Sequence, residues 1–371
     1  MGAGQKKLLI LNGSHSEIPL IIAAKKLGYY VVTSGNRPEL IGHNYSDEYQ
    51  FGDFSDRDER LKLAKKLNID AVCSCANDFG IITAAYISDK LSLSGHDSYE
   101  TTLLLHRKDM FKEFVSKNNI LSPSAKWYTD INDAIKDEAE FNYPLISKPV
   151  DLTGGKGVSK ISSIAEYKKA IIKAFNESKI NRIVVEEFIE GTQHSFSTFI
   201  LNGKVAFYFS DNEYSYLNPY LVSTSAAPAN NMSEIGNLLI KNVEKIADIL
   251  SLTNGIFHMQ YIYGNNQAYI IEVTRRCSGD LYPYPVQRST GIDWAEWIVK
   301  AETGMECSEF PEVRQKGYCG RHCIMAPQNG VIKDVIIDKS LEQDIYDSLC
   351  WCKKGDIITN HMIDKLGILL L

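Results

Sequence analysis

Short apolar runs alternate with amphipathic stretches over the first 95 residues of the chain. The strand-like runs span residues 8–11, 30–33 and 71–75, and the helix-like stretches span residues 18–27 and 57–67. Such alternation is typical of βαβ units around a parallel sheet. Asn12-Gly13 and Gly28 stand where tight turns and helix caps favour these residues. We therefore expect a Rossmann-like α/β unit over residues 1–96, to which we assign no dinucleotide because the full G-x-G-x-x-G motif is missing.

Strands dominate the pattern beyond Pro123, after helical patterns at residues 78–91 and 108–118. The predicted strands span residues 143–149, 182–188, 194–200, 205–209, 256–263 and 268–273, and the predicted helices span residues 164–175, 234–250 and 294–301. Asn and Gly at residues 201–203 and 264–266 lie between successive strands and indicate hairpins. These elements predict an α+β body in which helices cover antiparallel sheets.

Three units follow from these patterns. The Rossmann-like unit precedes the α+β body, which we place at residues 97–305 with a lid subdomain at about 120–195. Short strands are expected around Ile324, at 331–337, around Ile357 and in the apolar run at the end of the chain. We expect residues 306–371 to form a small closing unit.

Composition narrows the class of protein. Of 371 residues, 44% are hydrophobic and 23% are charged, as in soluble globular proteins, and no uncharged run approaches the roughly 20 residues of a membrane span. A formal net charge of −6 argues against nucleic acid as a partner, because phosphate backbones require clustered excess Lys and Arg. The eight cysteines are too few for a disulfide scaffold, and no apolar leader precedes Leu8. We expect reduced thiols, a cytoplasmic location and no membrane partner.

Lys148 ends an apolar strand and is followed by a loop with three glycines, Gly154, Gly155 and Gly157. Glycine admits positive φ and has no side chain, so such a loop brings backbone N–H groups against phosphate oxygens, while Lys148 adds positive charge. A glycine-rich turn alone is more often a mobile hairpin. The combination of strand, lysine and loop favours a phosphate site.

The strand at residues 183–187 runs into Glu186 and Glu187 and then Phe188 and Ile189. A purine needs an apolar slot with a donor and an acceptor at its edge, and the backbone around Phe188 with the Glu186 carboxylate offers these. Standing alone, the segment would read as a strand with a charged, solvated end.

Gln260 and Glu272 lie on two strands predicted to be antiparallel neighbours, and Arg275 and Arg276 follow the second. Their oxygens suit Mg²⁺ bound between protein and phosphates. An arginine there stabilises charge on a transferred phosphoryl group or clamps a carboxylate. Because successive strand residues face opposite sides, only one arginine should face the site. The alternative is a surface cluster of ion pairs.

The order of these motifs resembles the ATP-grasp superfamily, most closely the short relatives of the carbamoyl phosphate synthetase large chain. The resemblance runs from the strand at residues 7–11 to Arg276 and includes residues 94–101 and an expected helix at 106–112. It implies a Rossmann-like pre-ATP-grasp domain, a two-subdomain ATP-grasp fold, and ATP and Mg²⁺ as cofactors.

The resemblance also implies roles for single residues. Lys148 would bind the α- and β-phosphates, and Glu272 would ligate magnesium. The loop of Gly154, Gly155 and Gly157 would close over the phosphates, and the adenine would be held by Glu186, Glu187, Phe188 and Ile189. The family has a lysine or arginine facing the phosphates in the helix at 106–112, and counting back from residue 119 favours Lys108. Catalytic roles fall to Lys148, Arg276 and Arg275, with Arg276 favoured by the motif.

Three positions depart from the family's pattern. Gln193 stands where an acid usually holds the ribose, and an amide still hydrogen-bonds a hydroxyl. Gln260 stands where the first metal-binding acid is usual, and Thr274 replaces an asparagine. Because an amide is a weaker magnesium ligand than a carboxylate, one metal position is expected to be weak or filled mainly by phosphate oxygens.

Other polar clusters have weaker support. Cys319, Cys323, Cys350 and Cys352 have the residue types but not the spacing of a zinc site. His194 and His258 lie on strands of the expected site. We expect them to contact site residues without taking part in catalysis. The segment 211–227 is expected to be a specificity loop whose tyrosines, at 214, 216 and 220, either line a pocket or pack.

The leading hypothesis is an ATP-dependent carboxylate-amine ligase that forms an acyl phosphate and then a C–N bond. Its partners would be a small carboxylate and an amine, and a homodimer is left open. The alternatives are an enzyme that activates bicarbonate, as a carboxylase or in forming carbamoyl phosphate, and a nucleotide-binding regulatory protein without catalysis.

Overall fold

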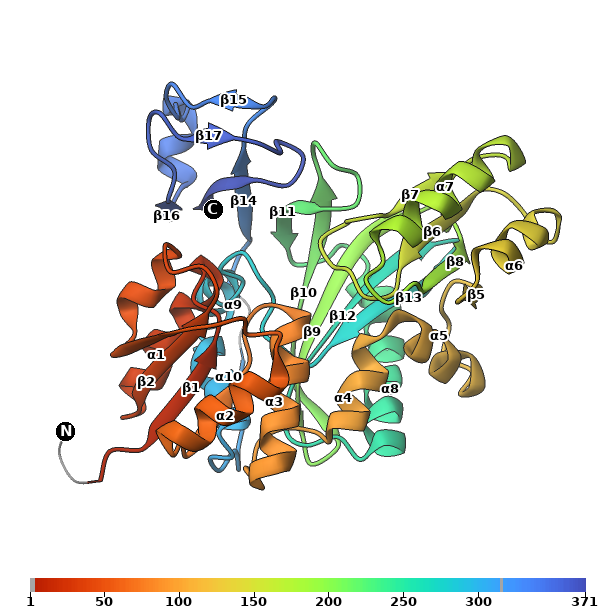
Figure 1. Cartoon of the computed structure of the whole chain (residues 1–371). Helices are drawn as coiled ribbons and strands as arrows, with labels where there is room; N and C mark the ends of the chain where they lie inside the picture. The colour runs from red at the N-terminus through yellow and green to blue at the C-terminus, as the bar shows by residue number, and fades with distance from the viewer. Residues whose placement is uncertain (1–3, 314–315) are drawn as a thin grey trace.

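The computed structural model describes residues 4–313 and 316–371. Its N-terminal unit contains a four-stranded parallel sheet of order β3-β2-β1-β4 (Figure 1). The strands are β1 (Lys7–Leu11), β2 (Tyr30–Gly35), β3 (Glu48–Phe51) and β4 (Ala71–Cys73), and the helices are α1 (Ile18–Lys26), α2 (Arg57–Leu67) and α3 (Asp78–Leu91). Alternate residues of β1 face opposite sides, Leu8 and Ile10 toward α1 and Leu9 and Leu11 toward α2 and α3. The predicted Rossmann-like unit is confirmed, with β3 as a strand that the sequence analysis missed.

Two helices connect this unit to the rest of the chain. They are α4 (Tyr99–His106) and α5 (Lys108–Lys117). Arg107 between them has an extended backbone, with φ −88° and ψ 118°. The expectation of one helix through residues 106–112 was therefore wrong, because His106 ends the first helix and Lys108 begins the second.

An eight-stranded antiparallel sheet forms the centre of the molecule, in the order β13-β12-β9-β10-β11-β14-β18-β16. Its strands before the C-terminal segment are β9 (Thr192–Leu201), β10 (Lys204–Ser215), β11 (Val222–Ala227), β12 (Gly255–Gly264) and β13 (Gln267–Thr274). Helix α8 (Met232–Leu250) packs on one face against Phe196 and Phe257. On the other face, α9 (Pro283–Thr290) and α10 (Trp294–Glu302) join the sheet to the N-terminal unit. The hairpins predicted at 201–203 and 264–266 are confirmed, with φ near 50° at Asn202 and Asn265.

A smaller four-stranded sheet, ordered β5-β8-β6-β7, forms the lid. Its strands are β5 (Ala125–Tyr128), β6 (Leu145–Pro149), β7 (Ser159–Ile161) and β8 (Ile183–Glu187), and its helices are α6 (Ile131–Lys136) and α7 (Ile164–Glu177). The apolar face of α7, with Tyr167 and Ile171, packs on this sheet. Figure 1 shows the lid beside β12 and β13 of the large sheet.

The C-terminal segment extends the large sheet. Strand β14 (Cys319–Met325) pairs with β11, and β18 (Lys365–Leu370) lies between β14 and β16 (Asp347–Cys350). The strand expected at 331–337 is confined to β15 (Gly330–Val331), which pairs with β17 (Ile357–Ile358). The expectation of a loop over residues 211–227 was also wrong. Its first residues belong to β10, its last residues form β11, and only the residues between the two strands connect them. Among the residues described, no helix is long and apolar enough to cross a membrane.

Candidate active site

A cavity of about 790 Å³ lies where the lid, the large sheet and the N-terminal unit meet. The predicted residues that line it are Lys108, Lys148, Gly154, Gly155, Glu186, Glu187, Phe188, Ile189, Gln193, Gln260, Glu272 and Arg276. Gly157 lies in the same loop but does not line the cavity, and Arg275 does not line it either. The topology therefore brings together motifs that lie up to 168 residues apart in the chain, from Lys108 to Arg276.

Two lysines enclose the Glu186 carboxylate at the lid end of the cavity. Lys148 on β6 pairs with one oxygen, and Lys112 on α5 lies 2.9 Å from the other. Burial opposes ionisation of Glu186, but Lys112 and then Lys148 outweigh it and lower the pKa of Glu186 to about 2. Burial also lowers the pKa of Lys112 to about 8, despite the attraction of Glu186.

Glu186 is expected to help hold the adenine, and in the structure each of its oxygens faces a lysine. Glu186, Phe188 and Ile189 all line the cavity, so their role in binding the base stays a prediction. What Glu186 does is fix Lys148, whose side chain is 7% exposed, at the cavity wall.

The glycine loop lies between β6 and β7. Gly154, Gly155 and Gly157 have φ values of 67°, 72° and 71°, in the left-handed region that favours glycine. A Cβ on Gly155 would lie 2.6 Å from the carbonyl oxygen of Tyr220, so the loop approaches the β10–β11 connection closely there. Lys108 donates from Nζ to the Leu152 carbonyl at 2.9 Å, which ties α5 to this loop.

Gln260 and Glu272 are direct partners in the β12–β13 register, so their side chains share one face of the sheet. Glu272 is half exposed to the cavity, and its carboxylate lies 3.9 Å from Lys108 Nζ. Among the residues described, no cluster of three or more His, Cys, Asp and Glu side chains could hold a metal ion. The donor set therefore fits Mg²⁺ held by one carboxylate, one amide oxygen and substrate phosphates, not an all-protein metal cage.

Glu213 on β10 was not predicted, yet it connects two of the three departures from the family's pattern, Gln193 and Gln260. Its Oε2 accepts a hydrogen bond from Gln260 Nε2 at 2.6 Å and another from Gln193 Nε2 at 2.9 Å. Burial, with Asp211 beside it, raises the pKa of Glu213. The alternation of Asp211 and Glu213 along β10 was the only sequence signal that could have indicated it.

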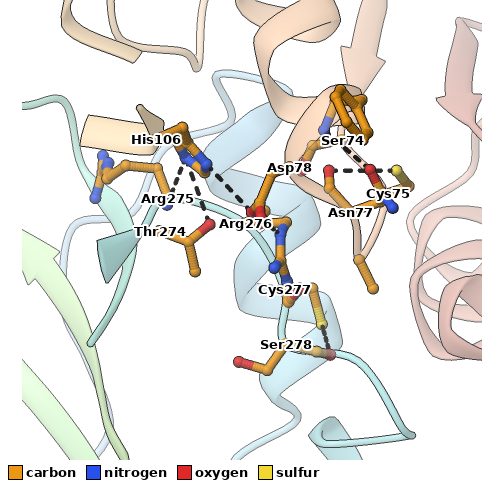
Figure 2. A network of polar contacts seen from close by, with 12 residues as sticks. Ser74, Cys75, Asn77, Asp78, His106, Thr274, Arg275, Arg276, Cys277 and Ser278 are labelled. Atoms are coloured by element: carbon orange, nitrogen blue, oxygen red, sulfur yellow. Dashed lines mark hydrogen bonds and ion pairs between the residues drawn. The ribbon is translucent and has the colours of Figure 1, made fainter. Parts of the chain in front are cut away.

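The two arginines after β13 point to different environments, as Figure 2 shows. Arg276 reaches the cavity, where its Nε donates to Asp78 at 2.7 Å, and Asp78 also contacts His106. Burial opposes ionisation of Asp78, but Arg276 and His106 hold its pKa well below the usual range. The predicted difference between the two arginines therefore agrees with their positions.

Arg275 is an interior structural residue. Its guanidinium pairs with Asp97 at 2.7 Å and donates to the backbone carbonyls of Thr253 and Ile256. Its donors are engaged by these groups and it does not line the cavity, so the structure gives Arg275 no contact with a bound substrate.

A second ionic cluster lies at the opposite end of the cavity and has no local sequence signature. The Asp280 carboxylate accepts from Lys365 at 2.6 Å and pairs with Arg321 at 3.2 Å, and His15 lies 3.8 Å away. Burial opposes ionisation of Asp280, but Lys365, His15 and Arg321 hold its pKa well below the usual range. Arg321 and Lys365 stand on β14 and β18, so the C-terminal segment completes this end of the cavity.

The remaining candidates lie as follows. His258 lines the cavity and bonds Ser197 at 2.6 Å, while His194 faces the other side of the sheet and stacks on Tyr261. Tyr220 lines the cavity, and the tyrosines at 214 and 216 are exposed. All eight cysteines are free thiols, as predicted.

Comparisons with known proteins agree with this geometry. Residues 106–217 match the family model of the ATP-grasp (A) domain of phosphoribosylglycinamide synthetase. The carbamoyl phosphate synthase large chain of Clostridium acetobutylicum is 24% identical over an alignment of 308 residues; the match covers 78% of this chain but only 27% of that protein.

Solved structures match over nearly the whole chain. Phosphoribosylglycinamide synthetase from Anaerococcus prevotii has a TM-score of 0.77 at 24% identity, covering 99% of this chain and 94% of that one. L-amino acid ligase from Bacillus licheniformis has a TM-score of 0.83 at 21% identity, covering 99% and 93%. The resemblance to the ATP-grasp superfamily is thereby confirmed: the chain contains an ATP-grasp domain and has the ATP-grasp fold.

Proposed function

We propose that this protein is an ATP-dependent ligase that activates a carboxylate as an acyl phosphate and couples it to an amine, releasing ADP and phosphate. One observation carries the proposal. Phosphate-binding groups at Lys148 and the glycine loop share one cavity with Arg276 and with the Arg321 cluster. The cavity therefore has a nucleotide end and an acceptor end that meet at Arg276.

At the nucleotide end, Lys108 and Lys148 neutralise phosphate charge, and backbone N–H groups of the loop bind phosphate oxygens. Phe188 and Ile189 supply the apolar slot for the base. Glu272 and the Gln260 amide oxygen would hold Mg²⁺, which when bound neutralises the transferring phosphoryl group. The lid and the large sheet exclude water from the transfer.

At the acceptor end, Arg276 lines the cavity and would bind the acceptor carboxylate and the γ-phosphate. A carboxylate is a poor acyl donor, and replacing one of its oxygens by phosphate supplies a leaving group for the attacking amine. A planar guanidinium binds carboxylate and phosphoryl oxygens with two parallel hydrogen bonds. Arg321 is a second guanidinium, farther from the nucleotide, for the rest of the acid.

The experiment is a screen for phosphate release with ATP, magnesium and mixtures of organic acids and amines, including amino acids. We expect phosphate release that requires both an acid and an amine. Lys148→Ala is the negative control, since it removes the buried phosphate-binding charge, and Lys169→Ala, an exposed lysine on α7, is the matched control. Absence of stimulated release with every mixture would contradict the proposal.

A second candidate is activation of bicarbonate, which is favoured by the sequence relationship to a carbamoyl phosphate synthase chain. Bicarbonate is itself a small carboxylate and would fit between Arg276 and the phosphates. ADP formation that depends on bicarbonate, with no organic acid present, would support it. A chain that binds ADP tightly but turns over ATP with neither substrate class would instead be a nucleotide-binding regulatory protein.

A further inference from the structure

The amides of Gln193 and Gln260 come from different strands, β9 and β12, and converge on one oxygen of Glu213. The two hydrogen bonds to Glu213 Oε2 measure 2.9 and 2.6 Å. Glu213 is 6% exposed, so water does not compete strongly for this oxygen. A buried acceptor shared by two amides holds both side chains in single rotamers.

The chemistry of the amide fixes which end faces the cavity. When Glu213 is ionised it only accepts hydrogen bonds, and only the NH₂ group of a glutamine donates, so the nitrogens of both side chains face the Glu213 oxygen. Their carbonyl oxygens then point away from Glu213. For Gln260 the neighbour on the other side is Glu272, its partner on β13, and both residues line the cavity.

We propose that Glu213 is a positioning residue that makes two amides serve as oxygen ligands toward the nucleotide. By binding both nitrogens, it presents the Gln260 oxygen to the metal held by Glu272 and the Gln193 oxygen to a ribose hydroxyl. A carboxylate at either position would need no such partner, because its two oxygens are equivalent. The inference rests on the proposed nucleotide site but not on which acid or amine is joined.

A competing account makes Glu213 a direct metal ligand, and a third makes it a structural acid of the sheet. The accounts differ in how Glu213 couples to Gln260. If Glu213 acts through the amide, its effect on metal binding must vanish once residue 260 no longer needs orienting. If it binds the metal itself or only holds the fold, its effect must persist.

The experiment is a double-mutant cycle on Mn²⁺ affinity in the presence of saturating ADP, measured by electron paramagnetic resonance of free Mn²⁺. We expect Glu213→Leu to weaken Mn²⁺ binding roughly 10-fold, as removal of a partner that orients a metal ligand does. In the Gln260→Glu background the same substitution should change Mn²⁺ affinity less than about 2-fold, since a carboxylate binds in either orientation. Equal losses in both backgrounds, or no loss in either, would overturn the proposal.

Two further measurements keep the result interpretable. Glu213→Gln retains one accepting oxygen and should give an intermediate loss of Mn²⁺ affinity, which tests the idea even if the leucine variant does not fold. The affinity for ADP without metal reports on Gln193 alone. Glu213→Leu should lower this affinity both in the parent and in the Gln260→Glu variant, and an unchanged value would remove Gln193 from the proposal. If the parent binds no ADP at all, the proposed function fails before this inference is tested.

Discussion

The lysine and glutamate side chains at the lid end of the cavity form a charge system that exists before any nucleotide binds. Lys112, Glu186 and Lys148 are all nearly buried and carry a net charge of +1 when fully ionised. Burying an ion is costly unless it is paired, so the two lysines and the glutamate stabilise one another. The one positive charge left uncompensated is what an incoming phosphate would neutralise.

The pH dependence of stability should report on this cluster. The pKa of Glu186 lies at about 2 in the folded protein, below the ordinary value of 4.5, so its contribution is present above about pH 5 and is lost as the pH falls toward 2. Glu186→Gln should therefore destabilise the protein by about 3 kcal/mol at pH 6. The difference in free energy of unfolding between parent and variant, from urea titrations, should shrink between pH 5 and pH 3. A difference that stays constant over this range would contradict the assigned pKa.

The arginine pair gives a test with an internal control. Arg276→Lys should lower kcat roughly 10- to 100-fold with little change in ATP affinity, because lysine lacks the planar fork needed for charge that develops during transfer. Arg275→Lys should leave kcat close to the parent and cost about 1 to 3 kcal/mol of stability, since its buried hydrogen bonds are lost. Steady-state kinetics and urea unfolding on both variants measure this. The assignment fails if kcat drops more for Arg275→Lys.

Residue patterns predicted some of this site and not the rest, for a physical reason. Lys148, Glu272 and Arg276 stand at the ends of strands or next to turns, where local sequence marks them. Glu213 and Arg321 lie within strands, and side chains that they contact, Gln260 and Asp280, come from distant parts of the chain. Their roles arise from cross-strand register, which one sequence does not display.

At the scale of elements, the pattern of apolar positions predicted hairpins and amphipathic helices well, since both depend on local periodicity. It also predicted the helix at 108–118, which α5 matches. The helix at 106–112 that the resemblance implied was wrong, because α4 and α5 meet at Arg107 without Gly or Pro to mark the break. The pattern failed at residues 211–227, where the polar face of β10 resembles a loop. A strand whose polar side chains line a cavity lacks the apolar alternation by which strands are recognised.

The glycine loop and the β10–β11 connection touch at Tyr220, and this contact can be tested with a matched pair. Gly154 and Gly155 both have positive φ, but only at Gly155 would a Cβ meet the Tyr220 carbonyl, at 2.6 Å, while at Gly154 the space is open. Alanine at either position costs roughly 1 to 2 kcal/mol of backbone strain. Gly155→Ala should also push the loop away from Tyr220 and weaken ATP binding by a further factor of roughly 10, equivalent to about 1.4 kcal/mol. Calorimetric ATP affinities that fell equally in both variants would show that the contact does not matter.

At the scale of the whole molecule, the three predicted units share one hydrophobic core. Ile10 of β1, Phe199 of β9, Trp294 of α10 and Cys319 of β14 belong to the same buried cluster. Helix α10 packs on α1 and β4 of the N-terminal unit and on β12 of the large sheet. The boundaries at residues 96 and 305 describe the order of motifs along the chain. Side chains from both sides of each boundary pack in the same buried cluster.

A polar contact between the first unit and α10 makes this continuity testable. The buried Glu302 carboxylate accepts hydrogen bonds from both the backbone N–H and the hydroxyl of Ser74, the latter at 2.7 Å. Glu302→Gln replaces one accepting oxygen by a donor and leaves a Ser74 group without a partner, at a cost of about 1 to 3 kcal/mol. If the units unfold together, the variant should shift a single calorimetric transition to lower temperature, with van't Hoff and calorimetric enthalpies equal. If the N-terminal unit unfolds independently, Glu302→Gln will give two calorimetric transitions, or will lower the temperature of only the earlier part of one broad transition. Either result would show that the shared core does not make the molecule a single cooperative unit.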